Sequence, residues 1–332
     1  MNSVDFLSIG DTQYDTILSL APEEVSVRCR LNREDCKMCL DYAGKIPVSE
    51  LHAMVAGNAA NVAVTAARLD GTVALWTLLG DDEIADEEIQ TLQREGITTA
   101  WMEKVPGAES NRSTVITVNG ERTILVYHAP RRYVLPKNLP SARIVYFTSM
   151  GPGAETLFPA VIRYVERTGA RLVYQPGTYQ LRLGAERAQP LLALVNCIIM
   201  NKEEAQAYTH HRAGKPLELL RALKRLGAKI AVVTDGTNGS YATDGETSWS
   251  MGIRPEIPRI EATGAGDAFA SAFGVALLEG ATIPEALRWG TFNAEGVIQE
   301  FGPQKGILKR KQLEELCLRY PQFVAKEIER KA

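Results

Sequence analysis

Short apolar runs alternate with segments of helical periodicity along most of the chain. The run "VDFLSIGD" (4–11) is apolar, of strand length and closed by Gly and Asp, which is typical of a buried strand. The segment "NAANVAVTAARLDG" (58–71) has small and apolar residues at helical spacing and ends at a glycine, Gly71, which favours a helix capped there. The same alternation predicts strands at 72–82, 142–150, 170–177, 197–201 and 228–236, and helices at 86–96, 154–169, 216–227, 260–280 and 283–301.

Strands that alternate with helices need crossover connections. The pattern therefore predicts an α/β fold, a doubly wound and mainly parallel sheet flanked by helices. A chain of 332 residues can form one large domain of this kind, and we assign residues 1–332 to it. Residues 12–56 and 113–128 do not follow the rhythm, and the second stretch holds an Asn-Gly hairpin signal. We expect these two stretches to form a small β-sheet lid over one edge of the main sheet.

Composition and charge narrow the class of protein. A formal net charge of −3 argues against a broad electrostatic surface for nucleic acid. No apolar run is long enough to span a membrane, and the start "MNSVDFLSIGD" lacks the basic and apolar regions of a signal peptide. Five cysteines in 332 residues do not make a disulfide framework. We therefore expect a cytoplasmic protein with neither nucleic-acid nor membrane partners.

A turn of three small residues, Gly264, Ala265 and Gly266, leads into an apolar helix with Asp267 in its first turn. The start of a helix presents unpaired N–H groups and a partial positive charge, which suits a phosphate. A carboxylate there would repel the phosphate unless it acted on the attacking atom, so Asp267 is a candidate general base for phosphoryl transfer. The alternative is an ordinary helix with an acid in its first turn. The sequence contains no Walker A motif, which excludes an ordinary P-loop enzyme.

With a second segment, this turn resembles the signatures of the ribokinase (PfkB) family of sugar and nucleoside kinases. The stretch "AGNAANVAVTAARLDGTVALWTLLGDD" (56–82) is similar to the N-terminal Gly-Gly-x-x-x-Asn signature, and "EATGAGDAFASAF" (261–273) to the C-terminal Asp-Thr-x-Gly-Ala-Gly-Asp signature. The resemblance covers most of the chain, and two matches in the right order are more specific than one. It implies a ribokinase-like fold and an ATP-dependent, Mg²⁺-using kinase acting on a primary hydroxyl of a furanose sugar or of a nucleoside ribose.

The resemblance also implies roles for single residues. Asp267 would be the base, and the backbone of Gly264, Ala265 and Gly266 would form the anion hole. The positions that match the acceptor site are Asp15, Gly57 and Asn61, and we expect Gln13 and Asn58 alongside them to add polar contacts. The positions that match the ATP site are Asn201, Thr234, Gly236, Gly239 and Asn293, and Glu204 would serve Mg²⁺ through water. Taken singly, each of these residues could equally be a helix cap, a turn glycine or a surface group.

The chain departs from the family pattern at several positions. Glu261 and Ala262 stand where relatives usually have Asp and Thr, and Ala56 replaces the first signature glycine. In relatives that Asp helps to hold a monovalent cation beside the anion hole, and because Glu is one methylene longer, a potassium requirement stays open. The segment "QPG" (175–177) replaces the more usual Asp-Pro-Asn.

The acceptor itself is not determined by the sequence. Asn58 stands where relatives that use phosphosugars often carry Lys, which favours an unphosphorylated acceptor. A phosphorylated one stays open because basic side chains near the predicted lid could reach the site, namely Arg28, Arg30, Arg131 and Arg132. Specificity is expected to lie in lid and hairpin side chains such as Tyr14, Tyr127 and His128.

Three cysteines cluster in the predicted lid as C-x6-C-x2-C, namely Cys29, Cys36 and Cys39. A C-x2-C pair is typical of half a zinc site, and the other cysteine would be a third ligand. The candidates for the fourth ligand are His52, Asp35, Asp41 and a partner chain. The alternative is a set of reduced, partly buried thiols, and a disulfide is less expected in the cytosol.

Two other functions and one assembly were considered. A non-catalytic nucleotide or sugar sensor on the same scaffold is favoured slightly by Glu261 and Ala262. A dinucleotide-dependent oxidoreductase needs G-x-G-x-x-G directly after the first strand, which "SIGDTQYD" lacks. An unpaired lid edge is a pairing site, so a homodimer through the lid is a further hypothesis.

Overall fold

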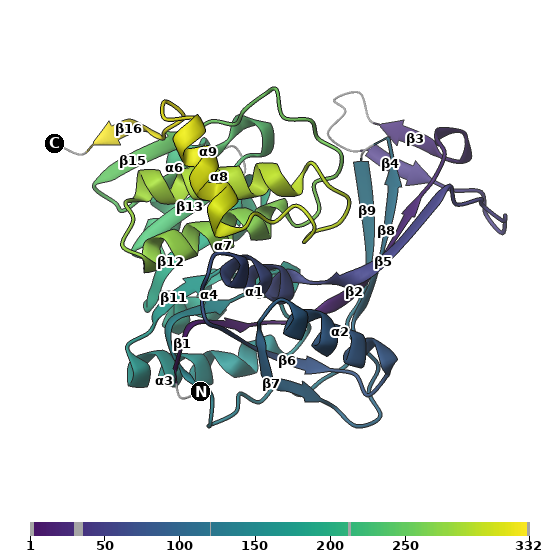
Figure 1. The fold of residues 1–332 in the computed structure, drawn as a ribbon, viewed down its shortest axis with the longest axis horizontal. Coiled ribbons are helices and arrows are strands. Elements are labelled where there is room, and N and C mark those ends of the chain that lie inside the picture. The colour runs from purple at the N-terminus through teal and green to yellow at the C-terminus, as the bar shows by residue number, and fades with distance from the viewer. Residues whose placement is uncertain (1–2, 30–35, 120, 212–213, 331–332) are drawn as a thin grey trace.

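A computed structural model describes residues 3–29, 36–119, 121–211 and 214–330. In this part of the chain ten strands form one main sheet, drawn through the body of the molecule in Figure 1. In spatial order they are β16 (Lys326–Arg330), β15 (Thr247–Met251), β14 (Ser240–Thr243), β13 (Ile230–Thr234), β12 (Val195–Asn201), β11 (Arg171–Tyr174), β10 (Ser141–Phe147), β1 (Ser3–Ile9), β6 (Val73–Leu79) and β7 (Thr98–Lys104). In this spatial order, the seven neighbouring strands that begin with β13 and end with β7 pair in parallel. The strands β14, β15 and β16 add an antiparallel edge beside β13. The predicted doubly wound, mainly parallel sheet is confirmed.

Helices cover both faces of this sheet because successive side chains of a buried strand point to opposite sides. In β1, Phe6 belongs to the core on one face and Leu7 to the core on the other. The first face is covered by α1 (Asn58–Arg68), α2 (Glu83–Arg94), α7 (Ala265–Leu278), α8 (Ile283–Val297) and α9 (Arg310–Arg319). The second face is covered by α3 (Phe158–Thr168), α4 (Thr178–Leu192), α5 (Lys202–Thr209) and α6 (Pro216–Arg225).

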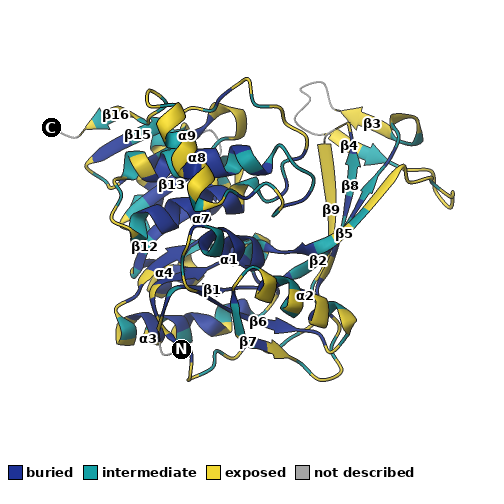
Figure 2. Ribbon diagram, viewed as in Figure 1, coloured by how far each residue is buried: buried dark blue, intermediate teal, exposed yellow. Residues whose placement is uncertain are grey.

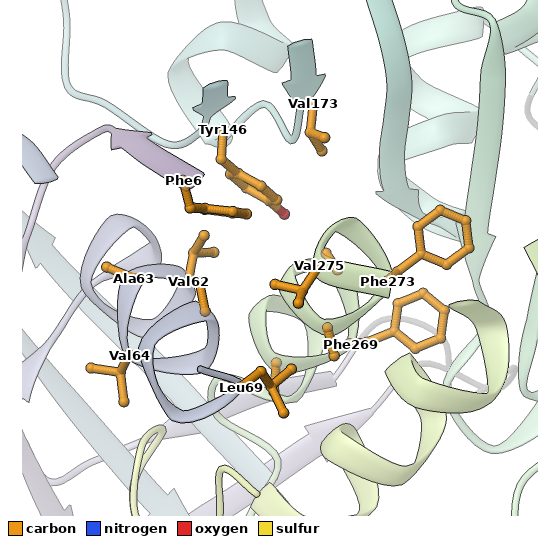
Figure 3. Close-up of a cluster of buried hydrophobic side chains, with 14 of the residues drawn as sticks. Phe6, Val62, Ala63, Val64, Leu69, Tyr146, Val173, Phe269, Phe273 and Val275 are labelled. Atoms are coloured by element: carbon orange, nitrogen blue, oxygen red, sulfur yellow. The ribbon is translucent and has the colours of Figure 1, made fainter. Parts of the chain in front are cut away.

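The core on the first face fixes α7, the helix that follows the Gly-Ala-Gly turn. Phe6 of β1 stacks on Tyr146 of β10 with ring centroids 5.7 Å apart. Figure 3 shows this pair beside Val62 of α1 and Val275 of α7. Figure 2 shows α7 dark blue along most of its length, as expected of a helix apolar on every side. Burial on this scale holds the start of α7 in a defined position.

A second, smaller sheet stands beside the main body (Figure 1). In the described residues its four strands are β5 (Glu50–Ala56), β2 (Gln13–Ser19), β8 (Arg112–Val118) and β9 (Glu121–Tyr127), in that order. The pair β2 and β8 is parallel, and the outer pairs are antiparallel. A ribbon of β3 (Ser26–Cys29) and β4 (Cys36–Cys39) lies near them. These elements come from the stretches predicted to form the lid, and we call the four strands the small sheet.

Some local predictions were incomplete. The sequence pattern did not predict β7, α4, α9 or β16. The sequence predicted that Gly71 caps α1, but the residue with left-handed backbone there is Asp70, with φ of 67°. The N–H of Gly71 donates to the carbonyl of Ala66 at 2.9 Å. Short 3-10 turns occur at Pro22–Glu24, Ala154–Leu157 and Gly236–Asn238. Over the described ranges, no helix combines the length and apolar character needed to cross a bilayer.

The zinc hypothesis is not supported. The antiparallel pairing of β3 with β4 sets Cys29 opposite Cys36, and their sulfurs form a disulfide. Sulfur in a disulfide is not a thiolate and cannot serve as a zinc ligand, whereas Cys39 lies opposite Ser26 and stays free. No cluster of three or more His, Cys, Asp or Glu side chains suited to a metal occurs among the described residues, and Asp35 lies outside them. The expectation of reduced thiols is therefore wrong for Cys29 and Cys36.

Candidate active site

Two cavities meet at the Gly-Ala-Gly turn. The first, about 640 Å³, lies between the small sheet and the main body and includes Asp15, Arg122 and Asp267 in its wall. The second, about 790 Å³, is mostly apolar and is lined by side chains such as Ile253, Phe269, Ala294 and Ile298. Both cavities are bounded by Thr234, Ala262 and Gly266. They lie beyond the carboxyl ends of β12 and β13, where ligands bind in open α/β sheets.

The turn itself requires glycine at its first position. Gly264 has φ of +79°, and a Cβ there would come 2.5 Å from the Cβ of Pro303. The N–H of Ala265 donates to the carbonyl of Ala262 at 3.3 Å, and that of Ala268 to Gly264 at 2.9 Å. The N–H groups of Gly266 and Asp267 make no hydrogen bond to any described residue, as expected for the first turn of a helix. An anion at this turn would find these two donors free.

Asp267 lies in the wall of the first cavity and is only 7% exposed. Its carboxylate accepts hydrogen bonds from three side-chain amides, those of Asn58 at 2.8 Å, Asn61 at 2.9 Å and Gln175 at 3.2 Å. Burial raises the pKa of Asp267, and the three amides and the positive charge of Arg122 oppose that rise. No basic side chain of the described residues forms an ion pair with it. The carboxylate is thus held in place by three neutral donors.

Asn58 and Asn61 reach Asp267 together because they stand three residues apart on α1, on the face that packs against α7. The other end of the Asn61 amide accepts from the side chain of Gln304 at 3.0 Å. Both ends of the Asn61 amide thus bond inside the protein, and the residue also lines the first cavity. Gly57, which precedes α1, has φ of +92°, and a Cβ there would come 2.7 Å from the backbone nitrogen of Gln13. That glycine lets α1 start directly against β2.

Asp15 faces the same cavity from β2 of the small sheet. It accepts a hydrogen bond from the hydroxyl of Ser113 on β8. Burial raises the pKa of Asp15 to about 6, and the nearby charges of Glu261 and Asp267 add to the rise. Gln13 lines the cavity beside it, and its amide nitrogen has no hydrogen-bond partner in the described structure.

Asn201 and Glu204 form a capping box at the start of α5. The side chain of Asn201 accepts from the backbone of Glu204 at 2.8 Å, and the carboxylate of Glu204 accepts from the backbone of Asn201 at 2.9 Å. Both residues also line the first cavity, and burial raises the pKa of Glu204. The two residues therefore do cap a helix, as the alternative interpretation held, and Glu204 lies on the cavity wall as well.

Apart from Asn201, the residues predicted for ATP fall into two groups. Thr234, Gly236 and Gly239 line the second cavity. Gly239 has φ of +88°, and a Cβ there would come 2.1 Å from the carbonyl of Met251, so the turn needs glycine. Asn293 lines neither cavity: it is fully buried, donating to Ala268 at 2.8 Å and accepting from Leu308 at 2.9 Å. It ties α8 to the start of α7.

Sequence reasoning missed several residues of the first cavity. They are Ser113, Arg122, Gln175, Tyr179 and Arg182. Gln175 belongs to the segment "QPG", whose departure from the family pattern could have indicated a residue of the site. No sequence pattern around Arg122 indicates that it reaches the cavity. Of the side chains predicted to set specificity, His128 lines the cavity and Tyr14 and Tyr127 do not. The basic candidates Arg28, Arg131 and Arg132 line neither this cavity nor the second, and Arg30 lies outside the described residues.

Comparisons with known proteins identify the class. Residues 24–310 match the pfkB family of carbohydrate kinases, and the chain belongs to that family. The chain is 27% identical over 267 residues to ribokinase from Bacillus subtilis (strain 168), which covers 78% of this chain and 86% of that protein. It is therefore a phosphotransferase with an alcohol group as acceptor.

Solved structures show the same fold. A putative ribokinase from Agrobacterium tumefaciens superimposes with a TM-score of 0.79 at 22% identity, covering 96% of this chain and 99% of that one. Ribokinase from Arabidopsis thaliana, complexed with ribose and ATP, superimposes with a TM-score of 0.76 at 20% identity, covering 95% and 98%. The predicted ribokinase-like fold is confirmed.

Proposed function

We propose that this protein is an ATP-dependent kinase that phosphorylates a primary hydroxyl of a furanose sugar or of the ribose of a nucleoside. The observation that carries the proposal is the place of Asp267, a buried base without an ion-pair partner in the described residues, at the start of α7 where two cavities meet. One cavity is polar enough for a sugar and the other apolar enough for an adenine. The comparisons give no support to a non-catalytic sensor, the alternative that Glu261 and Ala262 slightly favour.

In the proposed reaction the acceptor hydroxyl lies in the first cavity with its oxygen near Asp267. Asp267 takes the hydroxyl proton as the oxygen attacks the γ-phosphorus of ATP, and the bond between that phosphorus and the β,γ-bridging oxygen breaks to release ADP. The free N–H groups of Gly266 and Asp267 stabilise the negative charge on the transferring group. The three amides on Asp267 fix its direction without a cation that would weaken it as a base.

The second cavity is the proposed nucleotide site, with Thr234, Gly236 and Gly239 along the phosphate side. Glu204 and Asn201 line the first cavity together with Asp267 and with Thr234, which the two cavities share. Mg²⁺ keeps most of its waters and needs few protein ligands, so one carboxylate and one amide suit an outer-sphere role. When bound, Mg²⁺ would neutralise phosphate charge.

The acceptor is proposed to bind through Asp15, which accepts its hydroxyls, and through the free amide of Gln13. The small sheet carries both residues and would act as a lid that keeps water from the γ-phosphate. A cytoplasmic location stays a prediction. A homodimer through the small sheet is proposed because the outer strands β5 and β9 expose apolar side chains such as Leu51 and Leu125.

The test is an ATP-consumption assay over a panel of pentoses, hexoses and nucleosides. We expect at least one furanose-forming sugar or nucleoside to be turned over. Asp267→Asn should lower kcat by about 10²–10⁴-fold, because it removes the base while keeping the size of the side chain. Calorimetric titration with ATP should show unchanged nucleotide affinity for the variant. Near-normal turnover by Asp267→Asn would contradict the mechanism.

A further inference from the structure

One cation reaches the first cavity from the small sheet. Arg122 belongs to β9, and its guanidinium lies 3.5 Å from the carboxylate of Glu261, which precedes the Gly-Ala-Gly turn in the main body. The two residues are 139 positions apart in the chain. Their contact joins the small sheet to the segment that leads into the anion-binding turn.

Glu261 is buried, with a side chain only 6% exposed. One carboxylate oxygen accepts from the backbone and the hydroxyl of Thr263, with the backbone bond at 2.6 Å. The other oxygen is buried and has no hydrogen-bond partner in the described residues. A buried carboxylate with one vacant oxygen needs a positive partner. A guanidinium can meet both oxygens of a carboxylate at once, and a small approach of Arg122 would achieve this.

Arg122 also acts on Asp267. Both residues line the first cavity together with Gly266, and the positive charge of Arg122 lowers the pKa of Asp267 against the effect of burial. The guanidinium is therefore close to the place where the transferring phosphoryl group would lie. The other arginine among the described residues of this cavity, Arg182, lies over the ring of Tyr179, 5.7 Å from its centroid, and makes no hydrogen bond or ion pair with the turn.

Glu261 stands where the family resemblance implies a monovalent-cation ligand. Its carboxylate is instead turned to Thr263 and Arg122, which leaves a single free oxygen for a metal ion. Potassium and sodium need several oxygen ligands, so this donor set fits a guanidinium better than an alkali cation.

We infer that Arg122, anchored by Glu261, supplies from the small sheet the positive charge that stabilises the transferring phosphoryl group, and that it takes the place of a monovalent cation. This inference rests on the proposed function. Closure of the small sheet would then do two things at once: it brings Asp15 onto the acceptor and Arg122 onto the phosphoryl group. Glu261 is a positioning residue in this arrangement, because it acts through Arg122.

The first test measures binding and needs no known acceptor. Calorimetry compares the affinity of wild type and Arg122→Ala for ADP alone and for ADP with aluminium fluoride, which imitates the transferring group. We expect unchanged affinity for ADP and at least a 10-fold loss for the aluminium fluoride complex. Equal affinities of the two proteins for both ligands would overturn the inference. A wild-type protein that bound no adenine nucleotide would overturn both the inference and the proposed function.

The second test measures turnover with the acceptor found in the panel. We expect Arg122→Ala to lower kcat by about 10²-fold or more with the KM for the acceptor nearly unchanged, and added guanidinium ion to restore part of the loss. Wild-type activity should be the same in potassium, sodium and choline salts. A raised acceptor KM with normal kcat, or a strict potassium requirement of the wild type, would each overturn the inference.

Two further variants complete the design. Arg28→Ala is the matched control, because Arg28 is an arginine of the nearby ribbon that lines neither cavity and should leave turnover unchanged. Glu261→Gln keeps an acceptor for Thr263 and removes the charge, and its effect on kcat should not add to that of Arg122→Ala. Fully additive effects would contradict the anchoring role of Glu261. Circular dichroism of each variant checks that it is folded.

Discussion

The bond pattern around Asp267 shows how a single residue is kept reactive. Three uncharged amides donate hydrogen bonds to its carboxylate and fix the direction of that group. Because they carry no charge, they lower the pKa of Asp267 less than a cation in contact would. Burial meanwhile raises its pKa. A general base works best when its pKa lies near the working pH, and this environment moves Asp267 in that direction.

Asp15 predicts a pH dependence of acceptor binding. Its pKa is raised to about 6, and the ionised form accepts hydroxyl hydrogen bonds more strongly than the protonated form. Acceptor affinity should therefore be full above about pH 7 and should fall up to 10-fold per unit as the pH drops below about 6. The measurement is the acceptor Kd by calorimetry from pH 5 to 8, without ATP.

Asp267 also titrates with a raised pKa, so the pH series needs two variants. In Asp267→Asn the loss of acceptor affinity at low pH should persist, because Asp15 is intact. In Asp15→Asn the affinity should be weak and independent of pH. An acceptor Kd that stays constant in Asp267→Asn would show that Asp15 is not the group responsible.

At the scale of single elements, α2 buries an acid that takes no part in the proposed chemistry. Glu88 is 1% exposed and accepts a hydrogen bond from the hydroxyl of Thr12, just before β2. Burial is the largest cause that raises the pKa of Glu88, to about 8. The folded protein therefore holds a proton at pH 7 that an unfolded chain would release. That neutral side chain fastens α2 beneath the strand that carries Asp15.

The proton on Glu88 predicts how stability changes with pH. Its folded pKa is above its unfolded value of 4.5, so its contribution is complete below about pH 4.5 and is lost as the pH rises through about 8. Glu88→Gln stays neutral throughout. Relative to wild type, this variant should gain unfolding free energy on the order of 1 kcal/mol per pH unit between pH 5 and 8, measured by urea denaturation.

Glu87→Gln is the control for this series, because Glu87 is an exposed neighbour on the same helix. Its difference from wild type should be nearly independent of pH. A constant difference between Glu88→Gln and wild type from pH 5 to 8 would show that Glu88 is ionised in the folded protein.

For the molecule as a whole, the site is assembled from parts that are remote in sequence. The small sheet contributes Asp15 and Arg122, α1 contributes Asn58, and the start of α7 contributes Asp267. The main body holds its half of the site rigidly through two buried cores, whereas β9 is exposed along its length (Figure 2). This difference places any closing movement in the small sheet and not in the turn that binds phosphate.

Closure of the small sheet predicts a change in backbone protection. Binding of ADP with D-ribose, or with whichever panel acceptor is turned over, should slow hydrogen–deuterium exchange in β8 and β9. Peptides from α3, none of whose residues lines either cavity, serve as the internal control and should not change. Mass spectrometry that finds unchanged exchange in β8 and β9 would show that the small sheet is a fixed structural flap.

The sequence by itself determined the features that depend on local order along the chain. Hydrophobic periodicity gave the alternation of strands and helices. The Gly-Ala-Gly-Asp turn and the N-terminal signature gave the family and the cavity residues at the starts of α7 and α1. These features could be predicted because each is specified by residues a few positions apart. The strands of the small sheet fall in the stretches that broke the alternation.

Only the tertiary structure decided which side chains meet. The fold brings Gln175 into contact with Asp267 and Arg122 into contact with Glu261. It buries Asn293, which the sequence predicted on a cavity wall, and it places Cys29 so that it forms a disulfide with Cys36. These contacts depend on strand register and on helix packing across the fold, and no short pattern in the chain encodes them. The same packing fixes the direction of the Asp267 carboxylate. The sequence therefore indicates which residues are candidates for catalysis, and the tertiary structure determines how they are arranged.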